Sequence, residues 1–413
     1  MENKDQTGTE EVEYSFKGMK IKFDDFKSKQ NFVSGTGISI AVQIPNLYVS
    51  GIMIFGPVTL SEVLVKTLSI SATVAIKSDE TGYPILSMDE CSLKAESYEL
   101  QDRAIVNIGI SQIKKLLDIY LKRKICPALK THLNDLNKQL WCYTLKATVS
   151  EYAEFDYSLM SADISANSIE MGLKGVFNNT QQHIETPSPP PAFSLASQST
   201  TNMFYIAVSA FTINSAFMVL HKTNVSNIRI TDEMVPSVSP IRLSTTTFGA
   251  FIPQISETHP DLKLDLKVKT VKEPIIKFEQ DHVILQLQSK VTAYDVQSDD
   301  TPHKLFVLDL ESVASVKITV EKGVLVFDLT LEKIEGSMNG KPFKQFKKND
   351  FLTVIMHDIV FPIIKAHLAK GFQLPGLLGS YIGKVHVINP QVKVLKDYVL
   401  IGADIQFGEN TSS

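Results

Sequence analysis

The sequence predicts an α+β protein built of two similar halves, and three observations support this fold class. The chain has 413 residues, more than one hydrophobic core usually serves, which predicts two domains. Strand-like alternation of apolar and polar residues gives way to a helical period twice along the chain, in the same order. A segment of the first helical stretch also aligns without gaps to a segment of the second, which favours internal duplication.

The composition indicates a folded protein without the charge balance of a nucleic-acid binder. Hydrophobic residues make up 44% of the chain and charged residues 21%, which is too apolar for a disordered protein. Lys and Arg number 41 against 45 Asp and Glu, for a formal net charge of −4. Because nucleic-acid binders usually carry a basic excess, we expect no nucleic-acid partner.

The first half is predicted to be mostly strands followed by one long helix. Within 14–108, short alternating runs such as 38–42 and 68–74 are separated by Gly and Pro residues. From 110 to 140 the apolar residues recur three or four positions apart, which predicts an amphipathic helix. Strand-like alternation then returns as far as Lys174.

A polar stretch that ends in the Pro-rich run 186–191 follows the first half. Consecutive prolines deny strands and helices their donors and favour an extended connector. We therefore predict an N-terminal domain over 1–179, a linker over 180–198 and a C-terminal domain over 199–413.

The second half opens with an uncharged stretch, 203–220, that has the minimum length for a membrane span. Its polar residues and the lack of flanking Lys or Arg clusters argue against a span, and bulky apolar residues recur near a helical period. We predict a buried or pocket-lining amphipathic helix, with a membrane span as the alternative. Strand-like runs follow at 262–271, 275–291 and 313–332, then a helical segment at 350–370 and strands to the end.

The two helical segments share more than their period. ICPALKTHL at 125–133 aligns to VFPIIKAHL at 360–368, with Pro, Lys, His and Leu in the same places. Two amphipathic helices can share apolar positions by chance, but these identities lie partly off the apolar stripe and favour duplication. Because proline inside a helix bends it, we expect a kink at Pro127 and at Pro362.

Four segments resemble one protein family: GLKGVF at 172–177, RLSTTTFGAFIP at 242–253, IVFPIIKAHLAKGFQLP at 359–375 and YVLIGAD at 398–404. They are similar to the family of bactericidal/permeability-increasing protein, lipopolysaccharide-binding protein, and the phospholipid and cholesteryl ester transfer proteins. The resemblance runs nearly end to end. It implies a boomerang of two pseudo-symmetric antiparallel barrels, each with long helices, joined by a central β-sheet. Each barrel would hold phospholipid acyl chains between its sheet and its helices.

The resemblance also implies a disulfide and a secreted, extracellular protein. Family members carry one disulfide between a strand of the first barrel and its long helix, and Cys91 and Cys126 lie where that bond would be. Two buried free thiols are the alternative, and Cys142 has no evident partner. In the secretory pathway three sequons, which also arise by chance, would carry glycans at Asn178, Asn224 and Asn410.

The N-terminus departs from the family pattern. Family members begin with a signal peptide and a long helix that closes the first barrel, ahead of the strand that resembles residues 14–19. The chain as given has neither, because its first residues are polar and acidic. Either the sequence is truncated or alternatively spliced, or its first barrel lacks the N-terminal helix and has a more open pocket. The second barrel has a counterpart of that helix at 203–220 and is expected to be complete.

The resemblance implies a lipid-binding or lipid-transfer protein, and the residues support binding rather than catalysis. The sequence contains no G-x-S-x-G, H-E-x-x-H or Walker A signature and no zinc-like cysteine spacing, so we expect no enzyme, no metal and no cofactor, with phospholipid as the ligand. The alternative is an innate-immunity protein that binds bacterial lipopolysaccharide or membrane surfaces. That function needs clustered basic residues, and the lysines within 17–29 are surrounded by acidic ones. A lipid-acting enzyme is the third hypothesis, and a monomer is expected.

Apolar stripes on the helical segments supply the candidate lipid-lining residues. Periodicity cannot separate a pocket wall from an ordinary dry core, which remains the alternative for each residue. In the first half the candidates are Ile113, Leu117, Tyr120, Leu121, Leu129 and Leu133. In the second half they are Phe204, Val208, Phe211, Phe351, Ile355, Ile359 and Ile363.

Overall fold

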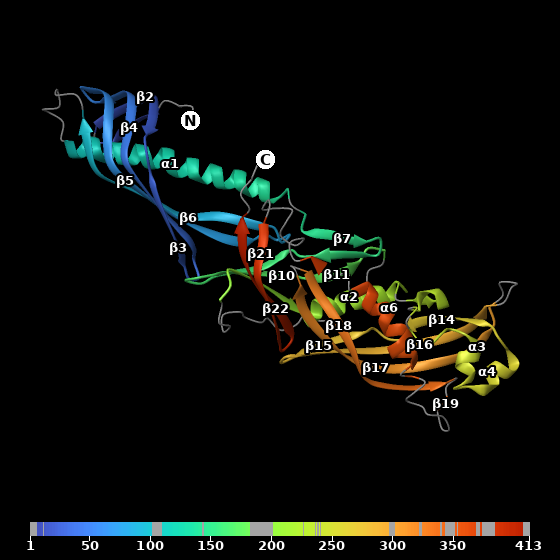
Figure 1. The fold of residues 1–413 in the computed structure, drawn as a ribbon. Coiled ribbons are helices and arrows are strands. Elements are labelled where there is room, and N and C mark those ends of the chain that lie inside the picture. Colours follow the sequence, from blue (N-terminus) through green and yellow to red (C-terminus); the bar gives the residue numbers. More distant parts are fainter. Residues whose placement is uncertain are drawn as a thin grey trace, which may run out of the picture. The chain divides into compact units, whose positions relative to one another are not determined.

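The computed structural model confirms an α+β protein of antiparallel strands with helices, in two compact units (Figure 1). One unit comprises Met1–Lys146 and Tyr157–Lys174, and the other Ala147–Asp156 and Gly175–Ser413. The residues that the structure describes are 6–10, 12–100, 110–142, 144–181, 201–225, 227–235, 237, 239, 241–296, 302–321, 324–338, 341–342, 352, 354–368, 372–373 and 385–407.

The first unit is built on a six-stranded antiparallel sheet in the order β1-β2-β4-β5-β6, with β3 also paired to β4. These strands are β1 (Gln6–Glu10), β2 (Val12–Phe23), β3 (Lys27–Val33), β4 (Gly37–Phe55), β5 (Val58–Ser78) and β6 (Pro84–Leu100). The strand-like alternation predicted over 14–108 is therefore confirmed, apart from 101–108, which lie outside the described residues. The strands β2 and β3 lie end to end along β4, and β1 pairs with the first part of β2. One edge of the sheet is therefore formed by β1, the remainder of β2 and β3, and β6 forms the other.

One long helix, α1 (Ile110–Leu140), covers this sheet and has the predicted bounds. Its N-terminal half packs into a core of strand residues that includes Phe16, Phe55 and Leu60. Pro127 lies inside the helix. The unit is completed by a hairpin of β9 (Leu159–Ile164) and β10 (Ile169–Leu173), whose end is tied to the β3–β4 turn by a 2.9 Å hydrogen bond from the Gly35 N–H to the Ile164 carbonyl.

The described residues of the second unit form one large sheet and two small ones. Its eight-stranded sheet comprises β13 (Ile228–Ile230), β14 (Lys263–Thr270), β15 (Ile275–Glu279), β16 (His282–Val296), β17 (Lys304–Glu321), β18 (Val324–Met338), β19 (Lys341–Pro342) and β20 (Phe372–Gln373). The small sheets are β11 (Val176–Asn179), β8 (Ala153–Asp156) and β7 (Lys146–Ser150), and β12 (Phe204–Ser209), β22 (Tyr398–Phe407) and β21 (Val385–Leu395).

The compact units divide the chain differently from the predicted domains. Residues 147–156 and 175–179 belong to the second unit, because β8 pairs with β11 there. Most of the predicted linker, 182–198, lies outside the described residues.

The stretch 203–220 is not one helix, which corrects the prediction. Its first part is β12, paired along its length with β22, and its second part belongs to α2 (Ala210–Lys222). The break falls at Ser209, whose hydroxyl accepts a hydrogen bond from the Thr212 N–H and so caps the helix. No helix among the described residues combines the length and apolar character that crossing a membrane requires.

The helical segment predicted at 350–370 is confirmed in part. Its described portion consists of a π-helical stretch, η2 (Val354–Val360), followed directly by α6 (Phe361–Leu368). Pro362 lies at this junction, whereas its counterpart Pro127 lies within a continuous α-helix. Because a proline has no backbone N–H to donate, the helical series of hydrogen bonds is interrupted at that residue, and the change from π-helix to α-helix falls at the same place. The described part of this unit also contains the short helices η1 (Asp232–Met234), α3 (Thr245–Gly249) and α4 (Pro253–Thr258).

Candidate functional site

The inner face of the first-unit sheet is the face that α1 covers (Figure 1). Cys91 on β6 is bonded to Cys126 of α1, which is the pairing that the family resemblance implied. Ala72 on β5 pairs with Cys91, and Ile40 on β4 pairs with Ala72. Because directly paired residues share a face and side chains alternate along a strand, the same inner face carries Ile38, Val42, Ile70, Val74, Met88 and Leu93.

Four predicted lining residues lie at one end of this face. Ile113, Leu117, Tyr120 and Leu121 project from the first half of α1, and none is more than 2% exposed. They belong to the closed core of the unit.

Four aromatic side chains form a cluster within that core. The ring of Phe16 lies 4.4 Å from that of Tyr120, 5.5 Å from Phe55 and 5.6 Å from Tyr14, measured between centroids. Burial raises the pKa of the Tyr120 phenol, since the phenolate would lose its hydration. The four rings therefore form a buried aromatic cluster between β2, β4 and α1.

The second half of α1 is covered far less. Leu133 is only half-buried and Leu129 is 37% exposed, although both belong to the apolar stripe that Leu117 and Leu121 begin. On the sheet, Ile38, Ile40 and Val42 are half-buried as well. The apolar stripe thus continues along α1 on the C-terminal side of Cys126, and there the protein's own side chains leave it partly uncovered.

The β2–β3 edge of the same sheet exposes aromatic side chains. Phe32 pairs with Ile38 and therefore belongs to the inner face, yet it is 40% exposed. Phe23 and Phe26 flank the break between the strands, half-exposed and in edge-to-face contact at 6.3 Å. This edge of the inner face is accordingly apolar and accessible, a feature that the sequence analysis did not identify.

In the second unit the structure separates the predicted residues. Ile355, Ile359 and Ile363 are buried in the core against the large sheet, and Val208 packs on its margin. Phe204 and Phe211 are half-buried, and Phe204 and Val208 project from strand β12 rather than from a helix. Phe351 lies outside the described residues.

Each unit ties a helix to a strand by an asparagine side chain. In the first unit, the Asn137 carboxamide of α1 accepts the Leu86 N–H at 2.8 Å and donates to the Leu86 carbonyl at 2.9 Å. In the second, Asn214 of α2 binds the backbone of Ile276 in the same way, at 2.8 and 3.0 Å. Because each amide satisfies two backbone groups, it holds the helix in register with β6 or β15.

The charged groups with shifted pKa values stabilise loops and edges rather than build a reactive centre. Burial opposes ionisation of Asp232, but the Leu243 N–H and the Arg242 guanidinium outweigh it and hold the pKa of the carboxyl below its usual range. Burial, together with a hydrogen bond to Asp118, raises the pKa of Tyr98 on β6.

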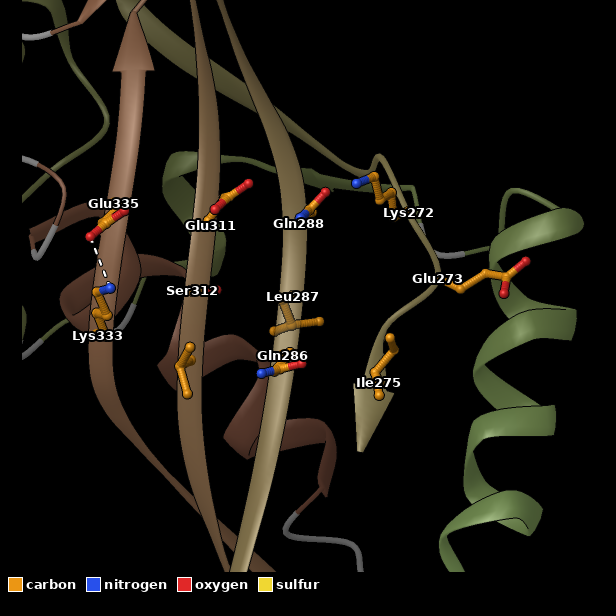
Figure 2. A pocket seen from close by; sticks show the side chains of 11 residues that line it. Lys272, Glu273, Ile275, Gln286, Leu287, Gln288, Glu311, Ser312, Lys333 and Glu335 are labelled. Atoms are coloured by element: carbon orange, nitrogen blue, oxygen red, sulfur yellow. Dashed lines mark ion pairs between the residues drawn. The ribbon is translucent and has the colours of Figure 1, made fainter. Parts of the chain in front are cut away.

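A polar pocket of about 260 Å³ lies on the outer face of the large sheet (Figure 2). Glu311 pairs directly with Gln288 and with Glu335, and Glu335 forms a 3.0 Å ion pair with Lys333. Lys272 and Glu273 project from the loop that joins β14 to β15 (Figure 2). Charged and carboxamide groups dominate this pocket, so it does not suit an acyl chain.

The remaining predicted groups are spread over the two units. Among the described residues, no three His, Cys, Asp or Glu side chains lie together in a way that could hold a metal ion. Cys142 is an exposed thiol. Asn178 is half-buried on β11, Asn224 is exposed just after α2, and Asn410 lies outside the described residues.

The fold and these apolar faces define a class of protein with paired α+β units that each enclose an apolar interior. Comparison with known proteins places the chain within that class. The model of the LBP / BPI / CETP family, N-terminal domain, matches residues 2–136, and that of the C-terminal domain matches 147–407. The chain therefore belongs to the LBP / BPI / CETP family, as the sequence resemblance predicted.

Individual relatives agree with this assignment. The chain is 38% identical over 411 residues to a bactericidal permeability-increasing protein of Sebastes schlegelii, a match that covers 96% of this chain and 86% of the relative. It is 26% identical to a lipopolysaccharide-binding protein of Mus musculus, over 96% and 84% of the two chains. A crystal structure of lipopolysaccharide binding protein shares the fold, with a TM-score of 0.51, 23% identity, and coverage of 99% of this chain and 92% of the other.

Proposed function

We propose that this protein is a secreted lipid carrier that binds phospholipid acyl chains between sheet and helix in each unit, as a monomer and without a cofactor. The observation that carries the proposal is the partly uncovered apolar stripe of the first unit, formed by Ile40, Val42, Leu129 and Leu133. Leaving such a stripe in water is unfavourable, and each methylene that a bound chain removes from water contributes about 0.8 kcal/mol. A carrier of this kind gains affinity by burial and requires no reactive group.

Native mass spectrometry after incubation with phosphatidylcholine vesicles tests the proposal. The expected species is the 45.9 kDa monomer with one phospholipid bound per unit. A chain that stays free of lipid would contradict it, and so would lipid that is consumed with turnover, which would indicate an enzyme.

Substitutions on α1 locate the lipid in the first unit. Leu129→Gln combined with Leu133→Gln removes apolar surface at positions that are not buried in the core, so folding should tolerate it. Lys130→Gln is the matched control on an exposed neighbouring position. We expect the double variant to lose one bound phospholipid and the control to lose none. If both variants bound the same number of phospholipids, the stripe would not be part of the lipid site.

Binding of lipopolysaccharide is the second candidate function. It is favoured by the names of the relatives and by exposed lysines along β2 and β3, namely Lys17, Lys20, Lys22, Lys27 and Lys29. Asp24 and Asp25 are exposed between these strands and reduce the local positive charge. We therefore expect salt-sensitive contact, with binding to immobilised lipopolysaccharide that weakens sharply between about 0.05 and 0.5 M NaCl. Binding that survives high salt would make lipopolysaccharide the principal ligand.

Secretion is supported by the Cys91–Cys126 disulfide, because such bonds persist in oxidising compartments. The exposed sequon at Asn224 is the best placed of the described sites for a glycan. Expression in secretory cells, followed by peptide mass spectrometry before and after removal of N-glycans, tests this. A cytosolic product with reduced Cys91 and Cys126 would contradict it.

A further inference from the structure

The polar pocket on the outer face of the large sheet contains one row of charged and carboxamide side chains. From β18 across β17 and β16 to the loop after β14, the row consists of Glu335, Glu311, Gln288 and Lys272 (Figure 2). Glu311 pairs directly with both Glu335 and Gln288. Lys272 comes next, because the Val271 N–H donates to the Gln288 carbonyl at 2.8 Å. The row therefore runs from acidic to basic across the sheet.

Two opposite charges of this row, Glu311 and Lys272, have no ion-pair partner among the described residues, and both residues are exposed. The other charges that line the pocket are neutralised by the ion pairs of Glu335 with Lys333 at 3.0 Å and of Glu273 with Lys222 at 3.4 Å. Neighbouring strands lie about 4.8 Å apart, so the backbones of Glu311 and Lys272 lie about 10 Å apart, with Gln288 between them. The pocket thus presents a carboxylate and an ammonium on either side of a carboxamide.

The position of Glu311 does not favour the fold. Its cross-strand neighbour Glu335 carries the same charge, and like charges directly opposite each other destabilise a sheet. Lys333 neutralises Glu335 and leaves Glu311 uncompensated. The Glu311 carboxylate is therefore available to a cationic group from outside the protein.

We propose that this row is a binding site for an aminoalkyl phosphate, in which a short carbon link joins a primary ammonium to a phosphate. The ammonium donates to the Glu311 carboxylate, and the phosphate accepts from the Lys272 ammonium. The carbon link lies over Gln288, whose carboxamide has both an acceptor and donors and so serves either end of the ligand. Because the pocket lies on the outer face of the sheet, the proposal does not depend on lipid binding inside either unit.

The remainder of the pocket leaves room for a larger ligand of the same kind. Its volume is about 260 Å³, against about 30 Å³ for a water molecule in the liquid. Beside the row it is lined by Val313, which is half-buried, and by Ile275, which is 45% exposed. These apolar side chains suit an ester substituent on the phosphate. Free phosphoethanolamine and the headgroup of phosphatidylethanolamine both have the required chemistry.

Equilibrium dialysis of the full chain against radiolabelled phosphoethanolamine tests the site. We expect a Kd of about 1 mM at low ionic strength, since the two charged contacts are exposed to solvent. Ethanolamine and inorganic phosphate, which each make one of the contacts, should bind about fivefold more weakly, and so should phosphoethanolamine to Glu311→Gln and to Lys272→Gln. Circular dichroism verifies that both variants fold.

Glu257→Gln and Lys267→Gln are the matched controls. They make the same charge changes at exposed positions of the second unit that do not line the pocket, so binding should be unchanged. Equal losses in the controls and the pocket variants would show a general charge effect and overturn the site. Phosphoethanolamine that binds the parent protein no more tightly than its two halves do would overturn it as well.

Vesicles of phosphatidylcholine, with and without phosphatidylethanolamine, distinguish the two sources of the ligand. Sedimentation of the protein that requires phosphatidylethanolamine and is lost in Glu311→Gln identifies the lipid headgroup. Binding in dialysis without such sedimentation identifies the free compound, and either result supports the site. A parent protein that shows neither overturns it, and lipid carried in the interior of the units would be unaffected by that outcome.

Discussion

Removal of the Cys91–Cys126 disulfide should destabilise the first unit selectively. The bond joins residues 35 apart in the sequence and connects β6 to the middle of α1. For a loop of that length the chain-entropy relation gives a stabilisation of about 4 kcal/mol, because the cross-link restricts the unfolded chain. With a urea dependence of about 2 kcal/mol/M, the midpoint should fall by about 2 M. The variant is Cys91→Ala with Cys126→Ala, made in a Cys142→Ala background to exclude disulfide exchange.

The single tryptophan makes the two units distinguishable. Trp141 lies just after α1 in the first unit and is 54% exposed, so its fluorescence reports unfolding of that unit alone. Far-UV circular dichroism reports both units. We expect an earlier fluorescence transition in the triple variant, a later dichroism phase that stays at its original position, and no change in Cys142→Ala by itself. Equal fluorescence midpoints in the triple variant and in Cys142→Ala would refute the predicted destabilisation of the first unit.

Three further outcomes are expected. Asn214→Ala leaves the Ile276 backbone groups without their side-chain partner, so it should cost the second unit about 1–3 kcal/mol, seen as faster hydrogen exchange in β15; unchanged exchange would contradict the tether. Gly37→Ala should destabilise the protein by more than about 1 kcal/mol in a urea titration, since φ is +152° and the added Cβ would lie 2.3 Å from a backbone oxygen. Gly35→Ala, at φ +71° with open space around it, should cost less in the same titration. Asp232 has a depressed folded-state pKa, so the stabilisation that its carboxylate provides is present above pH 3.8 and is lost as the pH falls through the folded value. The difference in melting temperature between the parent protein and Asp232→Asn should therefore shrink on acidification, and a constant difference would contradict this.

Some elements were predictable because their signal is local. The apolar period of α1 is sustained from Ile110 to Leu140, and the structure places the helix over the same residues. The stretch 203–220 was predicted less well, because Phe204 to Val208 are strand only through pairing with β22, nearly two hundred residues later. Ser209 carried a local signal for the true start of the helix, as a good N-cap residue.

The sequence by itself determined the class of this protein. Its duplicated order of strands and helix and its family-like segments are readable from residue types and spacing, because alternation, helical period and motif identity are local properties of the chain. The Cys91–Cys126 pair was implied only by the resemblance that those segments carry. Only the tertiary structure decided which part of the apolar stripe is filled. Leu121 and Leu129 have the same chemistry and the same place in the helical period, yet one is buried beside the aromatic cluster and the other is partly uncovered. Burial depends on what distant strands bring to the same place, and no periodicity within a single helix contains that information.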